Sequence, residues 1–264
     1  MTTLRENKLK FMIHNGELIT ESFSNTPYVF QNIHTLNHSA RYLSEHLSLL
    51  NHSANKLFGE QLKTNITQQQ ISHKIAELLA ANRLTRNASI CVEMRLDAVG
   101  NYELRSHEPS IYSGYVLRSL QPDAVCIPVN MPMPQHPTSA SVATRLLADS
   151  IAHKSGFHRA IIAERDGGLS VEPCEPLFIL NEYTLFAQEG CHSVEYELAI
   201  SAAKSIGLSL EQKRLMVGDL KDADEVFTVS WQGVTAMAHI GSKLYISLIS
   251  EKIAKAMEQA ATRI

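Results

Sequence analysis

The sequence predicts an α+β protein of two domains, and three features support this prediction. Segments with alternating apolar residues, typical of strands, are mixed with segments whose apolar residues recur every three or four positions, typical of helices. Four prolines fall within residues 128–137, where neither a helix nor a central strand can continue. A chain of 264 residues also exceeds what one modest core requires. We therefore place an N-terminal domain at residues 1–128, a connector at 129–138 and a C-terminal domain at 139–264.

The N-terminal domain is expected to begin with a β-hairpin. Asn15 and Gly16 separate two short apolar runs within residues 11–19, and both residue types tolerate the positive φ of a tight hairpin turn. Apolar residues then recur at helical spacing, which predicts a first helix over residues 36–57.

A second helix is expected over residues 68–82. Thr67 precedes it as N-cap, and Gln70 occupies the reciprocal position of a capping box. The period then changes to that of strands, which are predicted at 89–96, 102–105, 115–118 and 124–128.

The C-terminal domain is expected to open with a helix over residues 140–155, which Gly156 ends in the C′ position. A strand over 159–163 leads into a glycine-rich turn at 165–168. Further strands are predicted at 169–171, 177–180, 185–187, 214–217 and 225–230, with helices at 194–206 and 243–261.

Composition excludes several classes of function. The net charge of -3 comes without a basic cluster, so neither nucleic acid nor an anionic membrane surface is an expected partner. No window approaches 18 consecutive apolar residues, and no secretory or transit segment is expected at the start of the chain. The four cysteines are widely spaced and form no CxxC pair, which indicates reduced thiols. We expect a cytoplasmic protein.

Three stretches in a fixed order carry a resemblance to a known family. The first comprises residues 29–31 and 46–57, the second residues 156–162 and 168–178, and the third residues 220–234. They are similar to the motifs vFEt, HLxRLxxSAxxL, GxdeaLl, GxvxE followed by NlF, and lxxADEvF of the class IV aminotransferases. This family includes branched-chain and D-amino-acid aminotransferases and aminodeoxychorismate lyase.

The resemblance implies a fold and a set of partners. Class IV members have fold type IV, with a smaller N-terminal α+β domain and a C-terminal α/β pseudo-barrel domain. They bind pyridoxal phosphate (PLP) in the cleft between the domains. Active members are homodimers with residues of both subunits near the cofactor, so the resemblance also implies a homodimer.

The residue that the family uses for covalent chemistry is missing. Active members form a Schiff base through a lysine, but this chain has no lysine between Lys74 and Lys154. The resemblance places Ser141 at the lysine position, four residues before Arg145. A hydroxyl cannot form an imine, so we predict no catalytic residue here and expect no PLP cofactor. Lys154 lies at the far end of the same predicted helix, roughly 20 Å from its start.

The carboxylate that would contact the PLP ring nitrogen is displaced in the sequence. The family position falls on Val171, and Glu172 follows one residue late. On a strand, one residue reverses the direction of the side chain. A deletion within residues 173–175 would return Glu172 to the family position, so Glu172 remains a vestigial cofactor-binding candidate.

The expected phosphate contacts are also altered. The family arginine of HLxRL falls on Leu49, and its GxTR element aligns with residues 192–195, which end in Glu195. Loss of a charge-assisted contact costs about 1.5–3 kcal/mol. Ser230 and Thr235, near the family's second phosphate-binding turn, keep suitable hydroxyls and are further vestigial candidates.

Other candidate residues have simpler interpretations. The twelve histidines lack the ligand spacing of a metal site, so we predict none. We interpret His46 as a packing or hydrogen-bonding residue of its helix. We interpret Asp224 and Glu225 as the first residues of a strand, where their side chains cap or face solvent. We do not interpret them as an acid/base pair.

Three hypotheses of function follow. The first is a pseudoenzyme of class IV type that has lost PLP-dependent catalysis and binds a small amino or keto acid in the interdomain cleft, or acts through a partner. The alternative is an active PLP-dependent aminotransferase or aminodeoxychorismate lyase. The third is an enzyme that uses other groups in the same cleft for chemistry without PLP.

Overall fold

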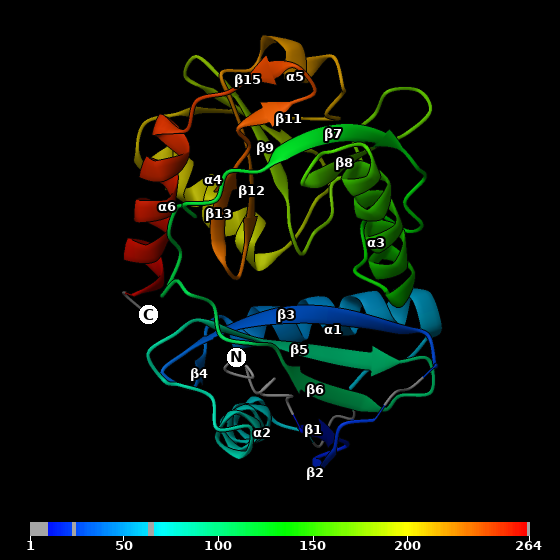
Figure 1. Ribbon diagram of the computed structural model, residues 1–264. Coiled ribbons are helices and arrows are strands. Elements are labelled where there is room, and N and C mark those ends of the chain that lie inside the picture. Colours follow the sequence, from blue (N-terminus) through cyan, green and yellow to red (C-terminus); the bar gives the residue numbers. More distant parts are fainter. Residues whose placement is uncertain (1–9, 23–24, 63–65, 263–264) are drawn as a thin grey trace, which may run out of the picture. The chain divides into compact units, whose positions relative to one another are not determined.

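The computed structural model describes residues 10–22, 25–62 and 66–262 (Figure 1). The chain divides into two compact units, one ending at Ile111 and the other beginning at Tyr112. Both units combine helices with strands, which confirms the predicted α+β class. The second unit begins before the predicted connector because β7 (Asp123–Pro128) pairs with strands that follow the connector in the sequence.

An antiparallel sheet forms the centre of the first unit. Its strand order is β2-β1-β6-β5-β3-β4. The hairpin between β1 and β2 is confirmed, with Asn15 at φ 48° and Gly16 at φ 90°. The strands are β1 (Phe11–His14), β2 (Glu17–Thr20), β3 (Tyr28–Leu36), β4 (Ser39–Ala40), β5 (Ile90–Asp97) and β6 (Tyr102–Ser106).

Helices α1 (Leu43–Phe58) and α2 (Gln68–Ala81) pack on one face of this sheet around a shared apolar core. The capping box of α2 is confirmed, because Thr67 accepts from the Gln70 backbone and Gln70 accepts from the Thr67 backbone. The first helix begins later than predicted. Residues 37–38 form the turn between β3 and β4, and this hairpin delays the helix until Leu43.

The second unit contains two sheets (Figure 1). One has the order β11-β10-β9-β12-β13 and the other β15-β14-β7-β8. The remaining strands are β8 (Arg159–Ala163), β9 (Leu177–Asn181), β10 (Thr184–Gln188), β11 (Ser209–Lys213), β12 (Glu225–Ser230), β13 (Gly233–Ala236), β14 (His239–Ile240) and β15 (Lys243–Leu244).

Four helices accompany these sheets: α3 (Ser139–Lys154), α4 (Val194–Ser205), α5 (Asp219–Asp222) and α6 (Leu248–Ala261). Helix α3 packs on β7 and β8 through small and branched apolar side chains, while α4 packs against α6. Gly156 follows α3 with φ 84°, as the sequence predicted. Among the described residues, no helix is both long enough and apolar enough to cross a bilayer.

Four predicted elements of the second unit are wrong. The strands expected at 115–118 and 169–171 form only isolated bridges, at Leu117 and Leu169, and two other elements are misplaced. The strand expected at 214–217 is found earlier in the sequence, as β11 (Ser209–Lys213), which pairs in parallel with β10. The terminal helix begins at Leu248 and not at residue 243, because Lys243 belongs to the short strand β15. Its ammonium group donates to the backbone carbonyls of Leu220 and Ala223 at 3.2 and 2.7 Å, which holds this segment outside the helix.

Glu225 determines where α6 starts. Its buried carboxylate accepts from the backbone nitrogens of Ile249 and Ser250 at 2.6 and 2.8 Å. These nitrogens would otherwise lack partners at the first turn of the helix. The structural interpretation of Glu225 is therefore confirmed, with a cap that comes from a distant strand.

Gly233 permits a close contact in the second unit and provides a test of this packing. Its φ is 104°, and a Cβ atom would collide with the Val116 carbonyl oxygen. We expect Gly233→Ala to lower the free energy of unfolding by about 2–5 kcal/mol, from backbone strain plus overpacking. Urea unfolding measures this change.

Gly207 provides the matched control. It also has a positive φ, 85°, but no atom lies within 4 Å of the position that a Cβ atom would occupy. Gly207→Ala should therefore cost only about 1 kcal/mol of backbone strain. Equal losses in the two variants would contradict the close contact at Gly233.

Candidate functional site

Ser141 lies in the first turn of α3, where its hydroxyl completes a helix cap. The Ser141 backbone nitrogen donates to Thr138 Oγ1 at 3.1 Å, and the Thr138 nitrogen donates to Ser141 Oγ at 3.0 Å. Ser141 Oγ also donates to the Thr138 carbonyl at 2.8 Å, and the side chain is buried. The residue at the predicted lysine position thus uses its hydroxyl locally, as both donor and acceptor.

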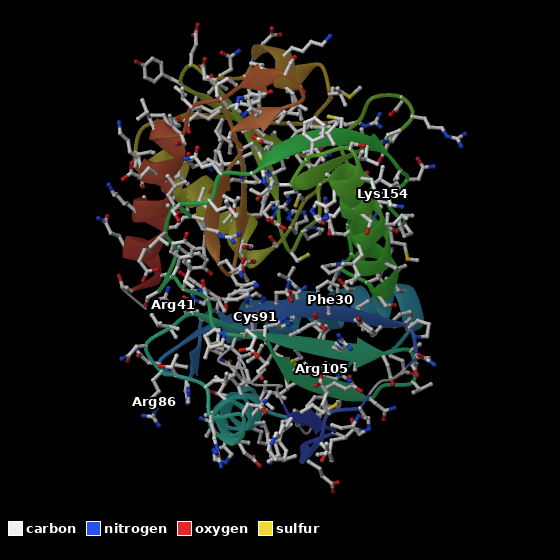
Figure 2. The ribbon with its side chains drawn as sticks, in the orientation of Figure 1. Phe30, Arg41, Arg86, Cys91, Arg105 and Lys154 are labelled. Atoms are coloured by element: carbon white, nitrogen blue, oxygen red, sulfur yellow. The ribbon has the colours of Figure 1, made fainter. Side chains whose placement is uncertain are left out.

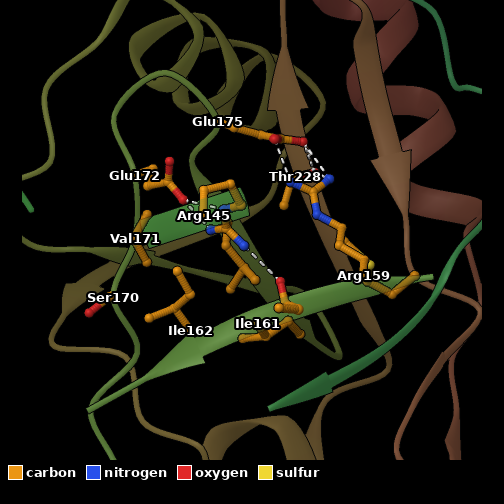
Figure 3. A pocket seen from close by; sticks show the side chains of 12 residues that line it. Arg145, Arg159, Ile161, Ile162, Ser170, Val171, Glu172, Glu175 and Thr228 are labelled. Atoms are coloured by element: carbon orange, nitrogen blue, oxygen red, sulfur yellow. Dashed lines mark hydrogen bonds and ion pairs between the residues drawn. The ribbon is translucent and has the colours of Figure 1, made fainter. Parts of the chain in front are cut away.

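One helical turn later, Arg145 forms the first of two partly buried ion pairs. Its Nε donates to Glu172 Oε1 at 2.5 Å, and its Nη2 also contacts Glu172. Nη1 donates to the backbone carbonyl of Ala160 on β8 at 2.8 Å. Arg145 therefore links α3, β8 and the segment that carries Glu172 (Figure 3).

The second ion pair joins Arg159 of β8 to Glu175. The guanidinium makes two contacts with the carboxylate, of which the bond from Nη1 to Oε1 measures 2.6 Å. Thr228 of β12 donates its hydroxyl to the same carboxylate at 3.0 Å. These five side chains line one small cavity, which we call the Arg–Glu pocket: Arg145, Arg159, Glu172, Glu175 and Thr228 (Figure 3).

A tight turn brings both carboxylates to the pocket. The Glu175 backbone nitrogen donates to the Glu172 carbonyl at 3.1 Å, which closes the loop over few residues. Val171 and Glu172 both line the pocket. Glu172 therefore reaches it although this residue lies one position later than the family pattern.

Burial and charge determine the protonation of these groups. Burial raises the pKa of Glu172, and Arg145 opposes this shift only in part. Burial also disfavours the charged form of Glu175, but Arg159 outweighs it and lowers the pKa of that carboxyl. Between them, burial and the neighbouring carboxylates raise the pKa of Cys174 well above its usual value. Cys174 is thus a neutral thiol and a poor nucleophile.

The Arg–Glu pocket is nearly filled by its own side chains. The cavity that remains has a volume of about 20 Å³. That is room for about one water molecule. A pyridine ring does not fit unless the two ion pairs move.

Ser230 and Thr235, the two hydroxyl residues predicted near a phosphate, do not line this pocket. Ser230 Oγ accepts from the Gln232 nitrogen at 3.2 Å in the turn between β12 and β13. Thr235 lies opposite Thr228 in the sheet and accepts from Arg118 at 3.3 Å.

Three pocket residues were not anticipated from the sequence: Arg159, Glu175 and Thr228. Arg159 stands where the motif GxdeaLl has an acidic residue, and this reversal of charge was a usable signal. Glu175, in the turn that follows Glu172, supplies the complementary charge. Thr228 alternates with apolar neighbours in β12 and gave no separate signal.

Glu195 is a buried carboxyl that lies close enough to the turn at residues 172–175 to affect Cys174. It follows the N-cap Ser193 by two residues in α4, is 3% exposed, and its Oε1 has no hydrogen-bond partner among the described residues. Burial raises the pKa of Glu195 to about 8. The side chain is therefore mainly protonated at neutral pH, and it brings no cation to the phosphate position that the resemblance assigned.

Two further interpretations can be compared with the structure. His46 is buried, its Nδ1 bonds Gln31 Oε1 at 3.1 Å, and burial lowers its pKa to about 3, which confirms a structural role. In residues 10–22, 25–62 and 66–262, no three His, Cys, Asp or Glu side chains gather in a way that could hold a metal ion.

The Arg145–Glu172 pair can be tested by removing one charge. We expect Arg145→Leu to lower the free energy of unfolding by about 3–5 kcal/mol, because Glu172 would remain buried without its counter-charge. The double variant with Glu172→Leu should recover most of this loss. Urea unfolding at pH 8 measures both. The exposed pair Lys255–Glu251 gives the control, since Lys255→Gln should cost less than about 1 kcal/mol.

Glu195 predicts a specific pH dependence of stability. Its pKa rises from 4.5 in the unfolded chain to about 8 in the fold, so folding takes up a proton in this window. The fold therefore loses stability as pH rises from 4.5 to 8. Glu195→Gln should remove this loss and be more stable than the parent above pH 8, by on the order of a few kcal/mol, with little gain near pH 4.5.

Urea midpoints at pH 5, 7 and 9 would measure the effect. Glu197→Gln, in the exposed part of the same helical turn, is the matched control and should show no such gain. A pH-independent difference between Glu195→Gln and the parent would contradict the buried, protonated carboxyl.

Comparison with known proteins identifies the family. The family model for amino-transferase class IV matches residues 29–240. A search of curated proteins finds no match. Solved structures of similar fold include the branched-chain aminotransferase of Thermoproteus uzoniensis with norvaline, 18% identical, with a TM-score of 0.76 and coverage of 96% of this chain and 94% of that one.

Two other solved structures agree in fold. The Escherichia coli branched-chain aminotransferase is 17% identical, with a TM-score of 0.72 and coverage of 94% and 92% of the two chains. A hypothetical aminotransferase from Mycobacterium tuberculosis, in its PLP-bound form, is 13% identical, with a TM-score of 0.77 and coverage of 96% and 99%. These likenesses confirm the predicted fold type IV. The chain belongs to the class IV aminotransferase family.

Proposed function

We propose that this chain is a class IV family member that does not use PLP as a covalent catalyst and binds a small amino or keto acid without covalent chemistry. One observation carries the proposal. Ser141, the residue that the resemblance places at the family's lysine position, is buried and uses its hydroxyl to cap α3. A capped hydroxyl has neither the nucleophilicity nor the chemistry of an amine that forms imines.

The lysines of the second unit support this proposal. No lysine lines the Arg–Glu pocket among the described residues. Lys154 ends α3 at the opposite end from Ser141 (Figure 2). Lys213 pairs with Asp219, and Lys243 is held by backbone carbonyls. Each of these amines is too distant or otherwise engaged.

The residues of the pocket do not fit covalently bound PLP. When bound, PLP withdraws electrons from an amino acid substrate through its protonated ring, which a carboxylate must support. Glu172 is instead paired with Arg145. Arg159 and Glu175 satisfy each other, so the four charges hold the pocket closed.

An active PLP-dependent aminotransferase or aminodeoxychorismate lyase is the second candidate. Two observations favour it. The chain belongs to the class IV aminotransferase family, and one solved structure of similar fold is a PLP-bound form. In addition, Glu172 lines the pocket, as the family's ring-nitrogen carboxylate would. This candidate requires Arg145 to release Glu172 and an amine from elsewhere to enter.

Absorbance and mass spectrometry distinguish the two candidates. We expect purified protein mixed with PLP to show no internal-aldimine band and no pyridoxyl-lysine peptide after borohydride reduction. A band abolished by borohydride, with a pyridoxyl group on one lysine at equimolar PLP, would overturn the proposal. Lys154→Arg is the control for the lysine of α3, and a class IV enzyme that retains its lysine is the positive control.

A further inference from the structure

Leu117 lies at the edge of a sheet, in a segment that pairs with β13 on one side and meets α6 on the other (Figure 1). The Val234 nitrogen donates to the Val116 carbonyl at 2.9 Å, and the Arg118 nitrogen donates to the Val234 carbonyl at 2.8 Å. Leu117, between them, therefore directs its own N–H and C=O away from β13. Within the described residues, neither group makes a hydrogen bond.

The neighbouring positions of this edge are already occupied. The Tyr115 nitrogen donates to Glu258 Oε2 of α6 at 2.7 Å. Tyr115 is two residues from Leu117, so both direct their backbone groups to the α6 side. On the other flank, the Ser119 nitrogen donates to the Tyr112 hydroxyl at 2.9 Å. Leu117 is therefore a gap of one residue, too short for a peptide strand to pair along it.

A cavity lies beside Leu117, between its segment and α6. Its volume is about 490 Å³. Small-molecule sites typically have volumes of about 300–1,000 Å³. Leu117 lines one wall and shares no lining with the Arg–Glu pocket. The opposite wall is formed by one face of α6, through Glu251, Lys255, Glu258, Gln259 and Thr262.

The charges around this cavity disfavour an anion. Lys255 donates to Glu251 at 2.7 Å, so these two exposed groups offset each other. Glu258 adds a further carboxylate, which is directed at the backbone of Tyr115. A phosphate or carboxylate in the cavity would meet this negative surplus, whereas a neutral ligand would not.

The backbone of Leu117 determines which ligand edge is complementary. Its N–H and C=O lie side by side and face the same way, so a partner needs an acceptor next to a donor. Nucleobases carry such an edge, as adenine does with its ring nitrogen beside its amino group, and so do primary carboxamides.

We infer that the cavity beside Leu117 binds a neutral planar ligand through such an edge, that of a nucleobase or of a primary carboxamide. The Leu117 N–H donates to the ligand's acceptor, and the Leu117 C=O accepts from its donor. The α6 wall closes the opposite side of the ligand. This site goes beyond the proposed function and does not depend on whether PLP reacts with the chain.

NMR of the full chain, labelled at its leucine amide nitrogens, tests this pairing. The Leu117 signal is assigned by its absence in Leu117→Ala. We expect it to shift and saturate on titration with adenosine in one arm or with nicotinamide in the other. Saturation with adenosine alone identifies a nucleobase site, and saturation with nicotinamide alone identifies a carboxamide site.

Each probe has a matched control that lacks the donor. Purine riboside is adenosine without its amino group, and methyl nicotinate replaces the amide of nicotinamide by an ester. We expect each control to bind about fivefold more weakly than its parent, through loss of one hydrogen bond. Equilibrium dialysis measures these affinities.

Two pairs of variants separate the backbone groups from the side chains. Leu117→Pro removes the N–H without removing a hydrogen bond of the fold, and it should bind about fivefold more weakly than Leu117→Ala, which keeps the N–H. Gln259→Trp places a ring in the cavity and should weaken binding by about tenfold or more. Lys252→Trp, exposed on α6 but outside the cavity, should retain affinity.

Four outcomes would overturn the inference. They are no saturation in either arm, equal affinity of a probe and its control, equal affinity of Leu117→Pro and Leu117→Ala, and equal affinity of Gln259→Trp and Lys252→Trp. If Leu117→Pro does not fold, the ligand controls and the two tryptophan variants decide, because they leave the Leu117 segment unchanged. Detection of an aldimine with PLP would contradict the proposed function without affecting these results.

Discussion

Two partly buried ion pairs, both made to carboxylates of a single turn, hold the second unit together around its pocket. Arg145 comes from α3 and Arg159 from β8, yet both meet carboxylates separated by only two residues. Buried charges lose hydration, so such pairs are tolerated only where their geometry is good and their remaining groups are bonded. Arg145 meets this condition through the Ala160 carbonyl, and Glu175 meets it through Thr228. Each charged side chain therefore fixes the position of the others.

This mutual fixation limits the chemistry of the pocket. Glu172 holds the Arg145 guanidinium through Oε1, so a second cation at this carboxylate would have to approach beside that guanidinium. Ser141 is equally engaged, because its hydroxyl completes the cap of α3 in both directions. Opening the pocket would thus expose unpaired charges before any ligand contact could offset them. The pocket is better suited to structural support than to the approach of a ring.

Local signals in the sequence predicted much of this fold, whereas contacts between distant residues escaped it. The Asn15-Gly16 turn and the Thr67 cap depend on residues within a few positions, and both are confirmed. The start of α6 depends on Glu225, which caps a nitrogen 24 residues away, so apolar periodicity extended the helix too far. The candidate site shows the same difference between local signals and distant contacts. Alignment with family motifs led to Glu172, but its partner Arg145 is 27 residues distant, and neither periodicity nor composition reveals such a pairing.

The N-terminus of α4 and the side chain of Arg118 both carry positive charge in this unit. A helix N-terminus attracts anions through its free backbone N–H groups and dipole. At α4 this attraction acts on Glu195, yet burial outweighs it and the carboxyl keeps its proton. The first turn of α4 is therefore occupied by a neutral acid of the protein itself. Arg118, by contrast, keeps a permanent charge beside Thr235, with a buried donor that lacks an acceptor. A neutral carboxyl thus already fills the end of α4, whereas the charge of Arg118 beside β13 has no ion pair among the described residues.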